Sequence, residues 1–138
     1  MAKCDVSMPD DFLLKLSALG NKTDEIIPKV LESGGEIVLD KVKSNLSSVV
    51  GSSRATGELI NSLGLSPAKQ DREGNWNVKI GFKEPRSDGG SNAKIANIIE
   101  YGRSGQQPKP FLKPAKKQSQ NACVDAMKLR FEREVGNI

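Results

Sequence analysis

The sequence predicts an α+β fold: a long amphipathic N-terminal helix, a small antiparallel β-hairpin or sheet, and two C-terminal helices separated by a proline-rich extended loop. Apolar residues recur every three or four positions from Ile26 to Leu46, which is the period of a helix with one buried face. Apolar and polar residues alternate from Trp76 to Phe82, which is the period of a half-buried strand. Three prolines then fall between two further helical patterns, at positions 108, 110 and 114.

Size and composition predict a single domain over residues 1–138. A chain of 138 residues with 36% hydrophobic residues has enough apolar surface for one modest core. Aromatic residues make up only 4%, so the core must be aliphatic and thin, and such cores often depend on neighbouring subunits. Residues 1–22 are expected to form a peripheral N-terminal helix.

The N-terminal half is predicted to be mainly helical. A short helix follows Pro9 and ends at Gly20, and Thr23 with two acids opens the long helix. Gly34 and Gly35 destabilise that helix unless another element packs closely against it. The serine-rich run at 44–53 is expected to end the helix in a loop, and Thr56 is expected to cap a single turn.

The predicted hairpin pairs residues 63–69 with residues 76–82 across a polar loop. Pro67 has no backbone N–H, so its strand belongs at a sheet edge. Residues 83–91 have almost no apolar side chain and contain a Gly-Gly pair, which predicts a mobile surface loop.

The C-terminal third is predicted to contain two helices, with a helix-ending glycine and a proline-stiffened loop between them. Ile95, Ile98 and Ile99 have helical spacing, and Gly102 is suited to the left-handed position that ends a helix. The segment 106–113 should be extended, and Pro114 should stand in the first turn of a helix that reaches Val135. Its expected apolar stripe consists of Ala115, Ala122, Cys123, Ala126, Met127, Leu129 and Phe131.

Phe111 and Leu112 have two possible roles. A proline-stiffened segment loses little entropy on docking, so the pair could anchor the chain on a neighbour. The pair could instead fill the core of its own chain, as single aromatic residues after turns usually do. We favour docking, because residues 103–107 offer no apolar contact that would hold the segment inward.

The order of these features resembles the tail-completion, or head-tail joining, proteins of long-tailed bacteriophages and prophages. In that family a Glu-aromatic-Gly step ends one helix and a Pro-Phe-Leu-x-Pro-Ala segment opens the last. The corresponding residues here are Glu100-Tyr101-Gly102 and 110–115, and Thr56-Gly57-Glu58-Leu59 with Ser62 matches a third step. The family usually has Gly-Thr after the aromatic residue, whereas Arg103 follows Gly102 here.

This resemblance implies a structural tail protein that completes the tail end and helps join it to the head, as a ring around the DNA channel. Its partners would be copies of itself, adjacent tail and connector proteins, and passing double-stranded DNA; it would occupy the virion tail and, during assembly, the host cytoplasm. The residues expected to dock on a subunit or partner are Glu100, Tyr101, Gly102, Pro110, Phe111, Leu112 and Pro114. The basic residues expected to face DNA or a partner are Arg103, Lys109, Lys113, Lys116 and Lys117.

Charge is distributed unevenly along the chain. Residues 1–40 contain eight acids and four lysines, whereas residues 101–138 contain eight Lys and Arg and three acids. No acid occurs between Glu100 and Asp125. This polarity suits head-to-tail contacts between copies, a basic face turned towards nucleic acid, or a solvated surface. A small basic cytosolic DNA-binding protein is therefore the alternative function.

The residue types argue against an enzyme, a metal site and a cofactor. The chain has no histidine, so the usual base for nucleophilic catalysis is missing, and neither Gly-Gly pair matches a phosphate-binding loop. Glu100 is expected to pair with a nearby Lys or Arg. Cys4 and Cys123 are expected to be free thiols in a reducing cytoplasm, since no apolar signal segment precedes them.

Overall fold

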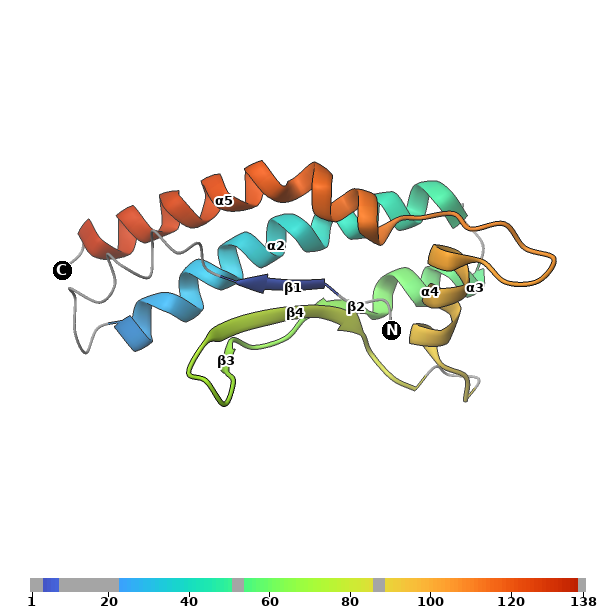
Figure 1. Ribbon diagram of the computed structural model, residues 1–138, viewed down its shortest axis with the longest axis horizontal. Helices are drawn as coiled ribbons and strands as arrows, with labels where there is room; N and C mark the ends of the chain where they lie inside the picture. Colours follow the sequence, from blue (N-terminus) through green and yellow to red (C-terminus); the bar gives the residue numbers. More distant parts are fainter. Residues whose placement is uncertain (1–3, 8–22, 51–53, 86–88, 137–138) are drawn as a thin grey trace.

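The computed structural model describes residues 4–7, 23–50, 54–85 and 89–136. Figure 1 shows an elongated molecule in three layers, with α5 over α2 and α2 over a small sheet, while α3 and α4 lie at one end. This confirms the predicted α+β fold. The elements are β1 (Cys4–Ser7), α2 (Thr23–Val50), α3 (Arg54–Ser62), β2 (Leu63–Leu65), β3 (Lys69–Gln70), β4 (Trp76–Phe82), α4 (Asn92–Tyr101) and α5 (Leu112–Gly136).

Helix α2 is the central layer and has two buried faces. Gly34 faces α5, because a Cβ added there would lie 2.6 Å from Met127 Cγ. Gly35 faces the sheet, because its Cβ would lie 2.8 Å from Leu65 Cδ1 and 3.1 Å from Val78 Cγ2. The close packing predicted for the glycine pair is thus confirmed, and it occurs on both faces of the helix.

Helix α5 runs antiparallel to α2 and contacts it along most of its length. Lys29 Nζ lies 3.5 Å from Glu134 Oε2 at one end of the pair, and Asn45 Nδ2 donates to Gln118 Oε1 at the other, at 3.1 Å. From Ala115 onward, the buried side chains of α5 recur every four residues, because this spacing keeps one narrow face on α2. They are Ala115, Ser119, Cys123, Met127 and Phe131.

The stripe predicted for α5 is therefore partly wrong. Ala122 is exposed, and Leu129 leaves 69% of its surface in solvent. Both residues fall off the four-residue spacing of the buried face. Ser119 takes a place on that face because its hydroxyl donates to Ala115 O at 2.6 Å, so the buried polar group is satisfied.

The sheet is antiparallel with β4 as its central strand. Strand β1 pairs with one edge of β4, and β2 and β3 pair with the other. Leu63 lies opposite Phe82 in β2, but Lys69 lies opposite Asn77 in β3, so the register shifts by one residue between the two pieces. The predicted hairpin is confirmed, with an interruption in its first strand.

Ser66 and Pro67 occupy this interruption. Ser66 N donates to Lys79 O at 2.8 Å, and Lys79 N donates to Ser66 Oγ at 2.8 Å. A side-chain oxygen thus takes the place of a strand carbonyl. Pro67 lies at the sheet edge, where its missing N–H leaves no ladder bond broken, as predicted.

Two predicted boundaries near the middle of the chain are wrong. Helix α2 continues through Ser44 to Val50, because Leu46 remains fully buried on its inner face. Helix α3 begins at Arg54, so Thr56 lies within the helix and is not its N-cap. The short helix predicted after Pro9 lies outside the described residues. The expectation of a peripheral helix over residues 1–22 is wrong at residues 4–7, which form strand β1.

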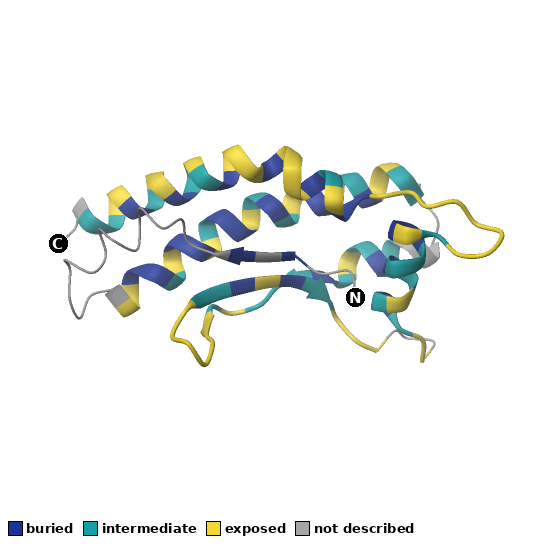
Figure 2. Ribbon diagram, in the orientation of Figure 1, coloured by how far each residue is buried: buried dark blue, intermediate teal, exposed yellow. Residues whose placement is uncertain are grey.

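The core lies where α2 meets α5 on one side and the sheet on the other. Figure 2 shows buried positions along the facing sides of these elements, with exposed positions on the outer side of α5 and in the loops. Its largest fully buried side chains are mainly aliphatic, as the composition predicts: Leu31, Leu46, Leu59, Ile80 and Met127, with Phe111 as the aromatic member.

Candidate partner-docking site

An exposed loop joins α4 to α5 and projects from one end of the molecule. All eight residues from 103 to 110 are exposed, and Figure 2 shows the loop extending beyond the helices that it connects. We call residues 103–110 the finger. Binding residues are often found on exposed loops that a rigid scaffold holds in position.

Gly102 fixes the first end of the finger. Its N–H donates to Ile98 O at 2.8 Å and its φ of 76° ends α4 as predicted. A Cβ at this position would lie 2.8 Å from both Gln106 O and Pro108 N. Glycine is therefore required here for its backbone conformation and for space.

The tip of the finger is a closed turn. Arg103 N donates to Gln106 O at 3.1 Å, and Gln106 N donates to Arg103 O at 2.8 Å. Gly105 has a φ of 82°, which suits a tight turn. Beyond the turn, Lys109 N donates to Ile99 O at 2.7 Å, and this bond holds the extended segment after the turn against α4.

Glu100 fixes the second end of the finger. Its carboxylate accepts hydrogen bonds from the N–H groups of Phe111 at 3.0 Å, Leu112 at 2.6 Å and Lys113 at 3.4 Å. These donors stand at the start of α5, where backbone N–H groups have no partner within the helix and the helix dipole favours an anion. A side chain of α4 thus caps α5, and it is 4% exposed.

The expected ion pair of Glu100 with a Lys or Arg is therefore wrong, and its capping role was missed. One signal in the sequence could have indicated it. Neither Pro110 nor Phe111 can supply a side-chain oxygen to cap the helix, and Glu100 is the last acid before Asp125. The acceptor for the start of α5 had to come from elsewhere.

Phe111 and Leu112 belong to the core of their own chain. Phe111 has no exposed surface, and Leu112 is 5% exposed. The Phe111 carbonyl also accepts from Asn45 Nδ2 of α2 at 3.2 Å. The preference for docking these two side chains on a neighbour is wrong, because the capped N-terminus of α5 turns both inward.

The remaining docking candidates lie around the finger. Tyr101 is 69% exposed at the end of α4, Pro110 is exposed, and Pro114 is half-buried in the first turn of α5, where it was predicted. Their contact with a partner stays a prediction. The structure therefore gathers Tyr101, Gly102 and Pro110 at an exposed end and assigns Glu100, Phe111 and Leu112 to holding that end in place.

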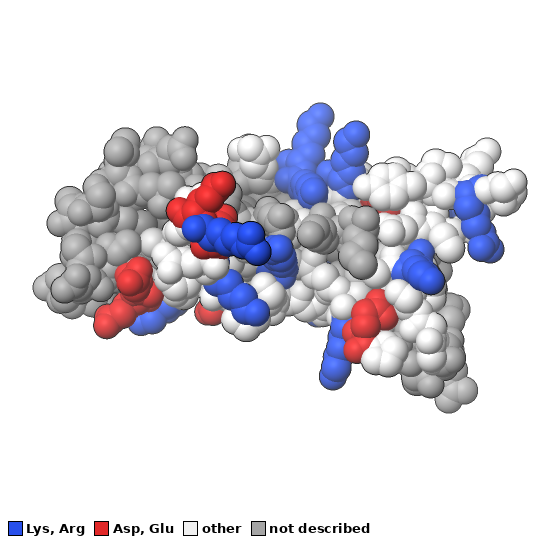
Figure 3. Space-filling model, turned by 60° about the horizontal axis from the view of Figure 1, so that its bottom comes forward, with Lys and Arg blue, Asp and Glu red and all other residues white. Residues whose placement is uncertain are grey.

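The five predicted basic residues are all exposed. Arg103 and Lys109 lie on the finger, and Lys113, Lys116 and Lys117 lie on the first turns of α5. Among the described residues, none of the five forms an ion pair within the chain. On the face drawn in Figure 3, Lys and Arg are spread along the molecule with acidic side chains among them. That face therefore has no continuous basic stripe.

Glu84 performs at α4 the role that Glu100 performs at α5. Its carboxylate accepts from Ala93 N at 2.7 Å, Asn92 N at 3.1 Å and Ser91 Oγ at 3.2 Å. Lys94 N donates to Ser91 Oγ, which is the N-cap. Both ends of the segment predicted to be a mobile loop are therefore anchored to α4, while residues 86–88 lie outside the described part.

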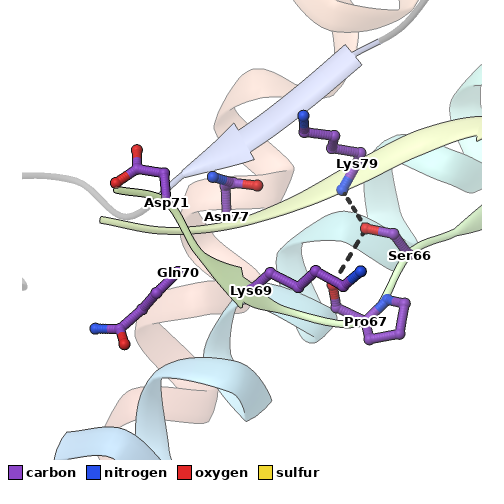
Figure 4. Close-up of a pocket in the computed structure, with 7 residues that line it drawn as sticks. All are labelled: Ser66, Pro67, Lys69, Gln70, Asp71, Asn77 and Lys79. Carbon is purple, nitrogen blue, oxygen red and sulfur yellow. Dashed lines mark hydrogen bonds between the residues drawn. The ribbon is translucent and has the colours of Figure 1, made fainter. Parts of the chain in front are cut away.

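A hollow of about 300 Å³ lies beside the shifted register of the sheet. Figure 4 shows its polar side chains spread around the rim, with Asp71 and Gln70 pointing in different directions. Asp71 Oδ1 accepts from Glu73 N and Asn75 N, each at 2.9 Å, so it shapes the hairpin loop. Across the described ranges no three His, Cys, Asp or Glu side chains converge as metal ligands.

Cys4 and Cys123 are both buried, and neither is in a disulfide. Burial, with a smaller contribution from Cys4, raises the pKa of the Cys123 thiol. None of the helices in the described part of the chain has the length and apolar character needed to cross a membrane.

Comparison with known protein families identifies a bacteriophage family. A family described as "Bacteriophage HK97-gp10, putative tail-component" matches residues 10–102, about two thirds of the chain. The match ends at Gly102, so the finger and α5 lie beyond it. Comparison with curated proteins and with solved structures gave no match.

Proposed function

The chain belongs to the HK97-gp10-like family of bacteriophage tail components, and from this membership we propose that it completes the upper end of a phage tail and helps to join the tail to the head. It works there as a ring of identical subunits around the DNA channel. Its partners are copies of itself and the adjacent tail and connector proteins. It is assembled in the bacterial cytoplasm and remains in the virion tail.

The finger is the observation that carries this proposal. Eight consecutive exposed residues are held at both ends by buried contacts, through Gly102 on one side and Glu100 on the other. A loop already fixed in shape loses little entropy when a partner covers it. Such a loop supports the role of a joint between proteins, where each subunit must present the same contact in the same position.

The basic residues of α5 support a weak contact with passing DNA. Lys113, Lys116 and Lys117 are exposed, and exposed cations bind phosphates without sequence specificity and in a salt-sensitive manner. The alternative function, a cytosolic DNA-binding protein, has less support. No aromatic side chain lies on the finger among its basic residues, so a stacking platform for bases is missing from that loop.

Deleting the gene from its phage or prophage tests the proposal. We expect induced cells to contain DNA-filled heads and separate tails, visible by electron microscopy, and we expect the wild-type gene supplied in trans to restore joined particles. Joined and infectious particles without the protein would contradict the proposal. Tight binding of purified protein to free double-stranded DNA would favour the alternative.

A further inference from the structure

We propose that the finger of one subunit docks on an acidic stripe along α2 of a second copy of this chain. The acidic stripe consists of Glu25, Glu32, Glu36 and Asp40. This inference rests on the proposed function and names the partner surface within the ring.

The acidic stripe lies on one exposed face of α2. Its members are separated by seven, four and four residues, which places them on the same side of a helix. All four are exposed, and no described residue forms an ion pair with any of them. Lys29 lies on the same side, but its ammonium pairs with Glu134 of α5. With Lys29 and Lys43 on the same side, this face has four acids and two lysines and carries a net negative charge.

The finger carries the complementary charge. Arg103 and Lys109 are its two charged residues, both exposed, and no acid occurs in the sequence from Tyr101 to Val124. Lys113 and Lys116 continue the positive charge onto the first turns of α5. Opposite charges on two exposed surfaces steer the approach of partners and fix their register.

The finger cannot occupy the acidic stripe of its own chain. The base of the finger lies beside Asn45, which donates to Phe111 O. Glu32 at the middle of the stripe is thirteen residues away along α2, or about 20 Å at 1.5 Å per residue. The finger also points away from α2, beyond the end of the helix layers (Figure 1). A second copy must supply the stripe.

The geometry of this contact suits a ring. The two surfaces differ and lie at different places on the molecule, so the contact is head-to-tail and leaves one finger and one stripe free after each addition. Contacts of this kind close into rings when the rotation between subunits divides a full turn, and otherwise form filaments.

Charge reversal on the two surfaces tests the contact in the full-length protein. Variant one is R103E/K109E, and variant two is E32K/E36K. We expect wild-type protein to self-associate at low salt, measured by sedimentation or light scattering, and each variant alone to associate at least about tenfold more weakly. A one-to-one mixture of the two variants should regain association, because each reversed finger then meets the two reversed positions of a stripe, and each unchanged finger meets an unchanged stripe.

Matched variants control for net charge. K69E/K79E makes the same change in net charge at exposed positions of the sheet and should associate as wild type does. Circular dichroism of each variant checks that the fold is retained. Monomeric wild-type protein at low salt, or a mixture that fails to regain association, would overturn the inference.

The proposed function has a separate readout. If R103E/K109E self-associates normally but cannot restore joined particles in a deletion strain, the finger contacts a different tail or connector protein. That result overturns the second-copy inference and leaves the joining function standing. If this variant restores joined particles fully, the finger has no role in joining and the inference also fails.

Discussion

A carboxylate with little solvent access is held at the start of α5 by three backbone donors, and this arrangement makes Glu100 a stability residue. Replacing Glu100 by Ala leaves those N–H groups without an acceptor in a closed environment. We expect the free energy of unfolding to fall by about 1–3 kcal/mol, and Glu100→Gln to lose less because one oxygen still accepts. Urea unfolding measures the difference.

Glu132→Ala is the matched control for Glu100→Ala, since Glu132 is exposed on α5, the helix that Glu100 caps. It should change stability by less than about 0.5 kcal/mol. Equal losses from both substitutions would show that the cap contributes nothing specific.

Phe111 offers the sharpest test of the corrected core assignment. Phe111→Ala removes a fully buried ring, so we expect a loss of about 3–5 kcal/mol and a clearly lower melting temperature of the isolated protein. Tyr101→Ala, at an aromatic side chain that is mostly exposed, should leave the melting temperature almost unchanged. An unchanged melting temperature for Phe111→Ala would contradict the core assignment and support the docking role of this residue.

Cys123 makes stability depend on pH at the alkaline end. Its pKa in the folded protein is raised above the ordinary thiol value of 9.0, mainly by burial. Below that value both states keep the proton and stability is unaffected. As the pH rises above it, the unfolded chain releases a proton that the folded chain retains, so stability falls. Cys123→Ala should flatten the decline, measured by urea unfolding between about pH 7 and pH 10.

At the scale of elements, the sequence predicted the helices and strands in which apolar residues recur with the period of the buried face. Helix α2, strand β4 and helix α4 were predicted on this basis, because each packs a regular face on the core. The register shift between β2 and β3 could not be predicted, since it depends on Ser66 bonding to Lys79 across the sheet. The end of α2 was misjudged because Leu46, whose burial depends on tertiary packing, outweighs the serines around it.

The site was predicted less well than the fold for a related reason. Gly102 and the prolines carry local backbone information, so the position of the finger could be inferred from the sequence. The roles of Glu100 and Phe111 depend on contacts across eleven residues and between α2 and α5. Residues 103–107 offer no apolar contact that would hold the segment inward, and this absence led to the wrong preference for docking.

The double packing of α2 gives a prediction about its glycines. Gly35→Ala should improve helix propensity, yet its Cβ would press on Leu65 and on Val78 of the central strand. We expect a net loss of about 1–3 kcal/mol, because overpacking outweighs propensity. Adding Leu65→Ala should recover part of the Gly35→Ala loss, measured as a non-additive double-mutant cycle.

Gly57→Ala is expected to change the free energy of unfolding in the opposite direction. Gly57 lies in α3, and a Cβ there would meet nothing within 4 Å. This substitution should raise stability by about 0.5–1 kcal/mol. A gain at Gly35 as large as that at Gly57 would contradict the close approach of α2 to the sheet.

The whole molecule is long, and five exposed basic residues lie on the finger and on the first turns of α5. Replacing Lys113, Lys116 and Lys117 together by Gln should leave the fold intact, since all three side chains are exposed. The melting temperature should stay level or rise slightly, because cations at a helix N-terminus are unfavourable to the helix dipole. If these residues face the DNA channel, particles with the triple variant should lose infectivity in a plaque assay.

Normal infectivity of the triple variant would remove the DNA contact and leave the three lysines as ordinary surface. K69Q/K79Q/K128Q is the matched control, with the same loss of charge at other exposed positions. Its infectivity should equal that of wild type.

Because Glu100 caps α5, the residues that stabilise the fold differ from the loop residues that are exposed to a partner. The side chains of residues 103–110 contribute little to the core, while both ends of the loop are fastened by buried groups. Substitutions at Ser104, Gln107 or Lys109 therefore carry almost no folding penalty. Related proteins can therefore differ in the amino acids of this loop, and so in the partner that they bind, while they keep the same fold.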